Sequence, residues 1–508
     1  MNFRQSQNYL TMHLLIRFRP NEVTVEDRMR IGFFLTYQKR HGQVTKFAKQ
    51  YQVSRPFIYR TAAVFKAFVE HYDSPKAKAE QAQKAIESLT RQIFSLRLDG
   101  KCGINSIHRI LGEQGTCYDS VGYISEMLRC AGEKVGNSVE FEQAMTFVFA
   151  SDEIFANGRP ILITVDPISL AILHISLADD RSAATWQAHF AALKGVNVQP
   201  LLLVKDEGQG LKAAQKACLA DVSVQSDTFH GVAHRLGAFK HRFQQQYETA
   251  LAKQIYAEEL YFKSKSDEIA EKRYQNCLVF ANNTEKAFAM RRDFCILYQF
   301  LLDCFQPFDN EGTLKNETTV VSDFDETLLL LKTLNNRAIN EEINSITACK
   351  STLFTFFKAT KEMVQTLTKT IDPTVLAYFC SAHQHHKNYV KAKKPEQQIY
   401  HKTHEQSILN LLYDELADDF NTQKTLVYSQ LSTIVQSSAA VECINSILRP
   451  YLNTSRGQLS QSALNLFMFY HNHRIFEAGA RKGKSPMQLL TGQKHEYWLD
   501  LLLSKIAT

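Results

Sequence analysis

Cysteine is present in this sequence without any pattern that would tie it to a metal or to a disulfide framework. The ten cysteines of the 508 residues are scattered, and no two of them form a CxxC pair. Zinc ribbons and small disulfide-stapled proteins show paired or regular spacings, so both classes are excluded. We therefore expect reduced thiols and a cytoplasmic protein.

Long hydrophobic runs are also missing. No apolar run approaches the ~20 residues that a membrane helix needs. The N-terminal segment MNFRQSQNYLTMHLLIRFRP lacks the apolar core and the small-residue cleavage site of a secretory signal. The sequence thus predicts a protein that has no membrane partner and stays in the compartment where it is made.

Charge of one sign is hardly in excess, because 59 Lys and Arg face 52 Asp and Glu and leave a net charge of +7. This balance permits a nucleic-acid partner but does not require one. With 44% hydrophobic and 22% charged residues, the composition is that of an ordinary globular protein, and the length suffices for several domains. Composition alone indicates no function.

Residues 1–75 are expected to form a helical DNA-binding domain. A first helix over 26–40 is followed by VTKFAKQYQVSRPFIYRTAAVFKAF, which has the rhythm of a helix-turn-helix. In that motif the second helix enters the major groove of DNA. The residues at the start of this second helix, expected to face base edges or phosphates, are Ser54, Arg55, Phe57, Tyr59 and Arg60. The alternative is a plain three-helix bundle with basic, solvated faces.

Residues 76–140 repeat this rhythm more weakly. The segment GINSIHRILGEQGTCYDSVGYISEMLRCAG predicts a helix through Ile104 and Leu111, a turn, and a second helix through Val121 and Leu128. A second helix-turn-helix unit would suit the reading of a long DNA site. A dimerisation module fits the same pattern.

Residues 141–235 change to a strand pattern. Strands are predicted at 146–155, 161–168, 170–178, 198–206 and 222–229, with helices at 183–193 and 208–219. This order is that of a ribonuclease-H-like α/β fold, a mixed sheet with helices, in which the fourth strand lies beside the first. The sequence therefore predicts a catalytic core of this fold class, with all-α regions before and after it.

Two of the predicted strands are interrupted by carboxylates, Asp152 in the first strand and Asp206 at the end of the fourth. A carboxylate in an apolar strand is costly unless it has a partner or a metal ion. Glu442, which opens a helix in SSAAVECINSILRPY, is the candidate for a third carboxylate. Three carboxylates suit Mg²⁺, and two such ions about 4 Å apart catalyse in-line displacement at phosphorus. Mn²⁺ is expected to substitute for Mg²⁺.

Asp166, at the end of the second predicted strand, is the alternative first carboxylate. It would leave 40 residues before Asp206 (206 − 166), whereas Asp152 leaves 54 (206 − 152), which is room for two strands and a helix. Asp166-Pro-Ile-Ser is also a natural turn at the end of a strand. Asp152 is therefore preferred.

Three segments resemble bacterial DDE-type transposases and integrases of the retroviral-integrase superfamily. They lie within 144–235 and 437–492 and read DEIFANGRPILITVDPISLAILHISLADDRSAATW, LLLVKDEGQGLKAA and ECINSILRPYLNTSRGQLSQSALNLFMFYHNHRIFEAGARKGKSPMQLLTG. The resemblance implies that Asp152, Asp206 and Glu442 are the catalytic and metal-binding residues. Asn445 and Arg449 follow Glu442 by three and seven residues and so share its helix face. Arg449 is a candidate for a phosphate contact or for a partner of a local carboxylate.

The long separation of Asp206 and Glu442, 236 residues (442 − 206), departs from compact integrases. Asp227-Thr-Phe-His230 resembles the C/D-x-x-H motif of an insertion-bearing branch that includes the Mutator-like and hAT transposases. The resemblance implies an all-helical insertion at 236–435 and a Glu-bearing helix within the helical tail at 436–508. Asp227 and His230 are then expected to support the active site, although a structural histidine is the alternative for His230.

Two details of the insertion are predicted separately. The basic segment SAHQHHKNYVKAKKPEQQIYHKTH (381–404) is expected to be a solvated loop, and LVYSQLSTIV (426–435) a strand. Cys380, His383 and their histidine neighbours lack a second pair at zinc-finger spacing, so no zinc site is expected there.

The sequence thus predicts a transposase that binds the terminal inverted repeats of a mobile element, cuts double-stranded DNA at the ends and joins the 3′-OH to target DNA. Pairing of two ends requires at least a homodimer, in the bacterial cytoplasm at the nucleoid. One alternative is a catalytically inactive DNA-binding descendant of such an enzyme. The other is a metal-dependent nuclease that cuts without joining.

Overall fold

The structure, a computed structural model, describes residues 23–72, 74–115, 120–455 and 459–507. It divides into two compact units, Met1–Leu96 with Leu111–Tyr118, and Arg97–Ile110 with Asp119–Thr508. The division falls within the helices α5 (Pro75–Leu98) and α6 (Ile104–Glu113). The second unit contains the sheet and the helices that follow it.

The first unit is built on three short helices, α2 (Val25–Tyr37), α3 (Gln43–Gln50) and α4 (Arg55–Tyr72). Its buried core consists of Ile31, Leu35, Phe47 and Ile58. α2 and α4 approach so closely at Gly32 that an added Cβ would lie 2.4 Å from the Cβ of Phe65. The three helices expected from the sequence are thus confirmed.

The second unit is organised around one five-stranded mixed sheet. Its strands are β1 (Met145–Ala156), β2 (Arg159–Val165), β3 (Ile172–Leu177), β4 (Val198–Lys205) and β5 (Ser223–Ser226). The order is β3-β2-β1-β4-β5, with antiparallel pairing of β1, β2 and β3 and parallel pairing of β1 with β4 and of β4 with β5. The predicted strands, and the predicted position of the fourth strand beside the first, are confirmed.

The two faces of the sheet have different roles. On one face, Phe149 of β1 packs against Phe190 of α8 (Ala183–Gly195), and α9 (Gln209–Cys218) adds to the same apolar cluster. Trp186 is 1% exposed in this cluster and is a core residue. Because side chains alternate along a strand, Asp152 lies on the other face from Phe149, the face on which α18 (Ala439–Thr454) packs against β1 and β2.

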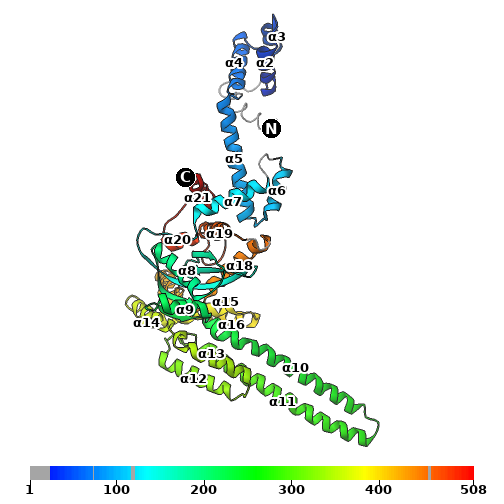
Figure 1. Ribbon diagram of the computed structural model, residues 1–508, viewed down its shortest axis with the longest axis vertical. Coiled ribbons are helices and arrows are strands. Elements are labelled where there is room, and N and C mark those ends of the chain that lie inside the picture. The colour runs from blue at the N-terminus through cyan, green and yellow to red at the C-terminus, as the bar shows by residue number, and fades with distance from the viewer. Residues whose placement is uncertain (1–22, 73, 116–119, 456–458, 508) are drawn as a thin grey trace. The chain divides into compact units, whose positions relative to one another are not determined.

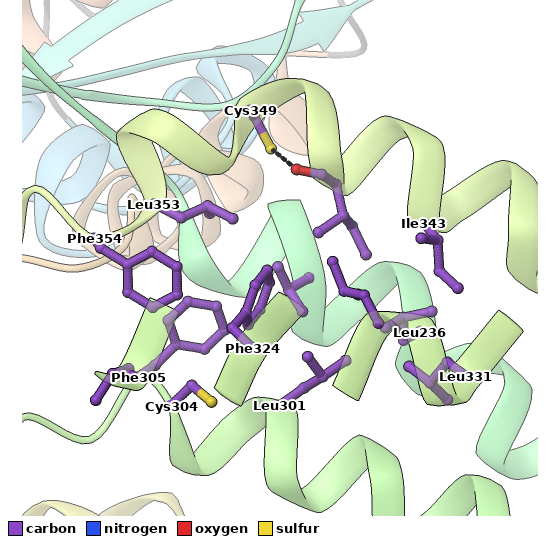
Figure 2. Close-up of a cluster of buried hydrophobic side chains, with 14 of the residues drawn as sticks. Leu236, Leu301, Cys304, Phe305, Phe324, Leu331, Ile343, Cys349, Leu353 and Phe354 are labelled. Atoms are coloured by element: carbon purple, nitrogen blue, oxygen red, sulfur yellow. Dashed lines mark hydrogen bonds between the residues drawn. The ribbon is translucent and has the colours of Figure 1, made fainter. Parts of the chain in front are cut away.

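An all-helical region follows β5, as predicted. Its elements are η1 (Phe229–His234), α10 (Arg235–Phe262), α11 (Asp267–Asp303), α12 (Glu317–Lys332), α13 (Arg337–Leu353), α14 (Phe356–Leu367), α15 (Pro373–Lys391), α16 (Pro395–Leu416), η2 (Ala417–Asp419) and α17 (Phe420–Leu431). α10 and α11 lie side by side as a long antiparallel hairpin (Figure 1). Figure 2 shows the core at its base, where Phe305, Phe324 and Phe354 pack together.

Two secondary-structure predictions in this region are wrong. Residues 381–404 are not a loop but belong largely to α15 and α16. The buried face of α15 runs from Phe379 into this segment as far as His383, so its polar residues do not mark a solvated loop. LVYSQLSTIV is not a strand, because Val427 and Leu431 lie four residues apart on the buried face of α17.

The chain ends with α18, α19 (Gln461–His473), α20 (Pro486–Thr491) and α21 (Trp498–Ala507). α19 packs against β3 and against α7 (Val121–Val135). The buried guanidinium of Arg97 donates to Thr454 Oγ1 (3.2 Å) and Ser455 Oγ (2.9 Å), which fixes the C-terminal end of α18. Among the described residues, no helix has the length and apolar character needed to cross a membrane.

Candidate active site

The parallel pairing of β1 with β4 brings Asp152 and Asp206 together. The last paired residues are Ser151 and Lys205, so the two aspartates are the next residues on adjacent strands. Asp206 Oδ1 accepts the N–H of Gly208 (2.9 Å), and Asp152 Oδ1 accepts the N–H of Glu153 (2.8 Å). β1 continues to Ala156, beyond the end of β4 at Lys205, and its last residues therefore form an open edge beside the aspartates.

Asp227 joins the end of β5 to the beginning of α18. Its Oδ1 accepts the backbone N–H groups of Phe229 (2.7 Å) and His230 (3.0 Å). Its Oδ2 accepts the backbone N–H (2.9 Å) and the hydroxyl of Ser438, the residue that precedes α18. Asp227 is 2% exposed. This buried carboxylate fixes η1 and the first turn of α18 to each other across 211 residues of sequence.

Glu442 reaches the same place from the first turn of α18. Its Oε1 is hydrogen-bonded to Nε2 of His230, which η1 carries. Both side chains line the cleft that also contains Asp152 and Asp206. The structure therefore gathers at one cleft residues that the sequence separates by more than 200 positions.

The cleft has a volume of about 1110 Å³ and includes Asn445 and Arg449 of α18 in its lining. Asn445 Nδ2 lies 3.5 Å from Asp152 Oδ2. Asn445 Oδ1 is buried and has no hydrogen-bond partner within the part of the chain that the structure describes. Such an unsatisfied amide oxygen is costly in a protein interior unless a ligand or water completes it.

The electrostatics of the cleft are dominated by negative charge. Burial, together with the nearby charges of Asp206 and Glu153, raises the pKa of Asp152 from 3.8 to about 7. The N–H of Glu153 and the charge of His230 oppose this rise. Among the described residues, no Lys or Arg side chain forms an ion pair with Asp152 or Asp206. Within the part of the chain that the structure describes, the two aspartates thus have no basic side chain as a direct ion-pair partner.

The neighbouring acids are already engaged. Glu153 accepts a hydrogen bond from Arg181 Nη1 at 2.7 Å. Glu207 accepts hydrogen bonds from Lys212 Nζ (2.9 Å) and Ser226 Oγ (2.7 Å). Because Glu153 and Glu207 are engaged in these contacts, Asp152 and Asp206 are the carboxylates of β1 and of the end of β4 that are available in the cleft.

Asp166 lies in a different setting. Its Oδ2 accepts the backbone N–H (2.8 Å) and the hydroxyl (2.6 Å) of Ser169, and its own N–H donates to Ala171 O. It is 4% exposed and closes the turn between β2 and β3. The structure therefore gives Asp166 the role of a turn residue and puts Asp152 in the cleft.

The donor chemistry of the cleft fits a hard divalent cation. Carboxylate oxygens are among the ligands that Mg²⁺ prefers, and Asp152 and Asp206 supply them in the cleft. Across the described residues, no group of three or more His, Cys, Asp or Glu side chains is gathered as a ready-made metal site. Here the third carboxylate, Glu442, is hydrogen-bonded to His230. That contact uses Oε1 of Glu442, so its other carboxylate oxygen would be the one to serve as a ligand.

The predicted DNA-contacting residues lie at the beginning of α4 in the first unit, with Ser54 directly before the helix. Ser54, Arg55, Tyr59 and Arg60 are exposed. Phe57 instead packs half-buried against the core of that unit, with the Arg28 guanidinium 5.7 Å from its ring centroid. The first turns of α4 thus present mainly basic and hydroxyl-bearing side chains to solvent.

A comparison with models of known protein families found a match for part of the chain. Residues 162–288 match the model of the Mutator family of transposases. The match runs from β2 into α11 and includes Asp206, Asp227 and His230, but neither Asp152 nor Glu442. It supports a transposase over that quarter of the chain. No curated protein matches the chain.

The sequence did not point to Ser438, Phe155 or Asn453. Ser438 donates a hydrogen bond to Asp227, and Phe155 and Asn453 line the cleft. Only Ser438 carries a signal that sequence reasoning could use, because serine is a preferred residue at the beginning of a helix. Phe155 and Asn453 have no local pattern that would distinguish them from other strand and helix residues.

Proposed function

We propose that the chain is a DDE-type DNA transposase with a ribonuclease-H-like core that cuts DNA at the ends of a mobile element and joins the 3′-OH to target DNA. One observation carries the proposal: Asp152, Asp206 and Glu442 line a single cleft although 54 and 236 residues separate them. The match of residues 162–288 to Mutator transposases supports it independently.

Asp152, Asp206 and Glu442 are the proposed ligands of two Mg²⁺ ions, for which Mn²⁺ would substitute. Divalent cations bound there would supply activation of the attacking oxygen and stabilisation of the leaving oxygen at phosphorus. Asn445 orients the Asp152 carboxylate, and His230 positions Glu442. Asp227 holds the Glu442 helix against β5. Arg449, on the same cleft, is placed to contact a DNA phosphate.

Double-stranded DNA is the proposed partner of both units. In the first unit, α3 and α4 would act as a helix-turn-helix, with Ser54, Arg55, Tyr59 and Arg60 toward the major groove and the backbone. Two element ends must be held at once for joining, so the working form would be at least a homodimer on DNA. We expect it in the cytoplasm of a bacterium, where the chromosome is accessible.

The experiment that tests the proposal follows a labelled DNA end with Mg²⁺, using the inverted repeats that bracket the gene. Wild type should give both nicked and joined products, and Asp206→Asn should give neither. Asp179→Asn is the matched control, because Asp179 carries an equally charged side chain that is 93% exposed. Joined products that persist in Asp206→Asn would contradict the proposal. Nicks without joined products would indicate a nuclease, and binding without either product an inactive descendant.

A further inference from the structure

A second, smaller pocket lies in the helical region that follows β5, and it shares no lining residue with the cleft. One face of α15 encloses it, together with residues 305–308 after α11 and residues from the end of α17 to Gln436. Its volume is about 40 Å³. Because one water molecule needs about 10–15 Å³, the pocket has room for a few water-sized groups and not for an extended ligand.

Two lysines of α15 line this pocket. Lys387 and Lys391 are four residues apart and so lie on the same face of the helix. Among the described residues, no Asp or Glu lines the pocket with them, and neither lysine forms an ion pair. Lys387 is half-buried, whereas Lys391 is exposed. A positive charge that is partly removed from water without a partner costs free energy.

The charge that acts on Lys387 is also positive. Burial, together with the charge of Lys391, lowers the pKa of Lys387 to about 8. Burial, followed by the charges of Lys387 and His386, lowers the pKa of His383 to about 3, so this imidazole is neutral at pH 7. A lysine in the last turn of a helix complements the helix dipole, which accounts for Lys391 but not for the burial of Lys387. The pocket thus has a positive potential that no anion balances.

The amide side chains of the pocket hold its walls together. Gln384 Nε2 donates to Phe308 O (2.9 Å), and its Oε1 accepts the N–H of Phe308 (3.3 Å). Gln436 Nε2 donates to Phe305 O (2.9 Å). These bonds occupy the carbonyl oxygens of both phenylalanines, so the two lysines remain as donors for a ligand.

We propose that this pocket binds one phosphate group between Lys387 and Lys391. A phosphate supplies the negative charge that the two ammonium groups lack, and lysine binds phosphate as a point charge. The small volume admits a single phosphate group, which either inorganic phosphate or a DNA backbone provides. The site is separate from the carboxylates, so the inference does not depend on cutting or joining.

A bound phosphate would also stabilise the segment that leads to α18. Gln436 O accepts the N–H (3.1 Å) and the hydroxyl (3.0 Å) of Thr228, the residue after Asp227. Neutralising Lys387 removes a cost from the junction of α15 with this segment. Phosphate should therefore raise the melting temperature of the wild-type protein.

The test follows the phosphorus NMR signal of inorganic phosphate with full-length protein, at constant ionic strength. EDTA is present so that no metal ion brings phosphate to the carboxylates. Wild type should bind one phosphate per chain with a dissociation constant on the order of 1 mM, and Lys387→Met should weaken binding roughly ten-fold. Lys393→Met, at an exposed lysine outside the pocket, is the matched control and should bind as wild type does.

Thermal melting shows whether Lys387→Met is folded. Without phosphate this variant should melt at or above the wild-type temperature, because it removes a partly buried charge without a partner. It should gain nothing from added phosphate. No binding by wild type, wild-type binding by Lys387→Met, or melting of this variant below wild type would overturn the proposal.

Two further measurements give the source of the phosphate and its place. A short DNA duplex that displaces inorganic phosphate would identify the DNA backbone as the source, and a duplex that leaves it bound would identify free phosphate. Arg449→Met should bind phosphate as wild type does, and loss there would put the phosphate in the cleft and overturn the pocket. Phosphate binding by a wild type that never cuts DNA would overturn the proposed function alone.

Discussion

The substitution Asp227→Asn tests how the fold delivers Glu442 to the cleft. The asparagine amide has the shape of the carboxylate, and its Oδ1 can still accept the N–H groups of Phe229 and His230. Its Nδ2, however, is a donor that would face the N–H of Ser438, also a donor. Ser438 is 1% exposed, so water cannot replace the lost acceptor. The first turn of α18 should therefore open more readily.

The magnitude follows from the contacts. An unsatisfied buried N–H costs about 1–3 kcal/mol, and hydrogen bonds to a charged acceptor are worth more than neutral ones. We expect a total near 3 kcal/mol, which is roughly a 100-fold change in an opening equilibrium. Ser438→Ala removes only the hydroxyl donor and should cost about 1 kcal/mol.

Hydrogen exchange measured by mass spectrometry on peptides that contain residues 438–442 reads this opening directly. The amide of Glu442 is the informative one, because it donates to Ser438 O in the same turn. Asp227→Asn should speed its exchange roughly 100-fold, and Ser438→Ala by less than ten-fold. The matched control is Asp221→Asn, at an exposed carboxylate just before β5. Wild-type protection of this turn in Asp227→Asn would refute the reasoning.

Three further predictions concern the core, the metal and the DNA contact. Trp186→Ala should lower the unfolding free energy of the second unit by about 3–5 kcal/mol, measured by thermal melting, because it leaves a cavity. Tyr59→Ala, at a residue that is 58% exposed, should have no such effect. Equal melting temperatures of the two variants would contradict the burial of Trp186. Mg²⁺ at 100 times its dissociation constant should stabilise the second unit by about 2.7 kcal/mol; the same gain in Asp152→Asn would place the ion elsewhere. Arg55→Ala should weaken binding to the cognate DNA by about 1–3 kcal/mol, and unchanged affinity in filter binding would remove Arg55 from the contact.

The sequence was sufficient to predict the pairing of Asp152 with Asp206. Each lies in an apolar run long enough to be a strand, and the order of strands and helices places the two runs side by side. The preference for Asp152 over Asp166 came from the same argument, and the turn contacts of Asp166 with Ser169 agree with it. The hydrophobic pattern of each strand and the order of the strands were enough to predict this pairing, because both can be recognised from short stretches of the chain.

Other features depend on contacts between distant segments and could not be predicted. The bonds from Asp227 to Ser438 and from His230 to Glu442 join residues more than 200 positions apart. Arg181 meets Phe155 only because β1 and the loop after β3 converge. The mistaken loop at 381–404 has a different cause, since polar residues such as Ser381 and His383 continue the buried helical face that begins before the segment.

The most direct test of the central claim, that Asp152, Asp206 and Glu442 hold metal ions together, is affinity cleavage of the polypeptide. Fe²⁺ is substituted for Mg²⁺, ascorbate and peroxide are added, and the fragments are mapped by mass spectrometry. We expect cuts close to residues 152, 206 and 442, all suppressed by excess Mg²⁺ and lost together in Asp206→Asn. Cuts near Asp166 in place of Asp152, or no cuts near Glu442, would contradict it.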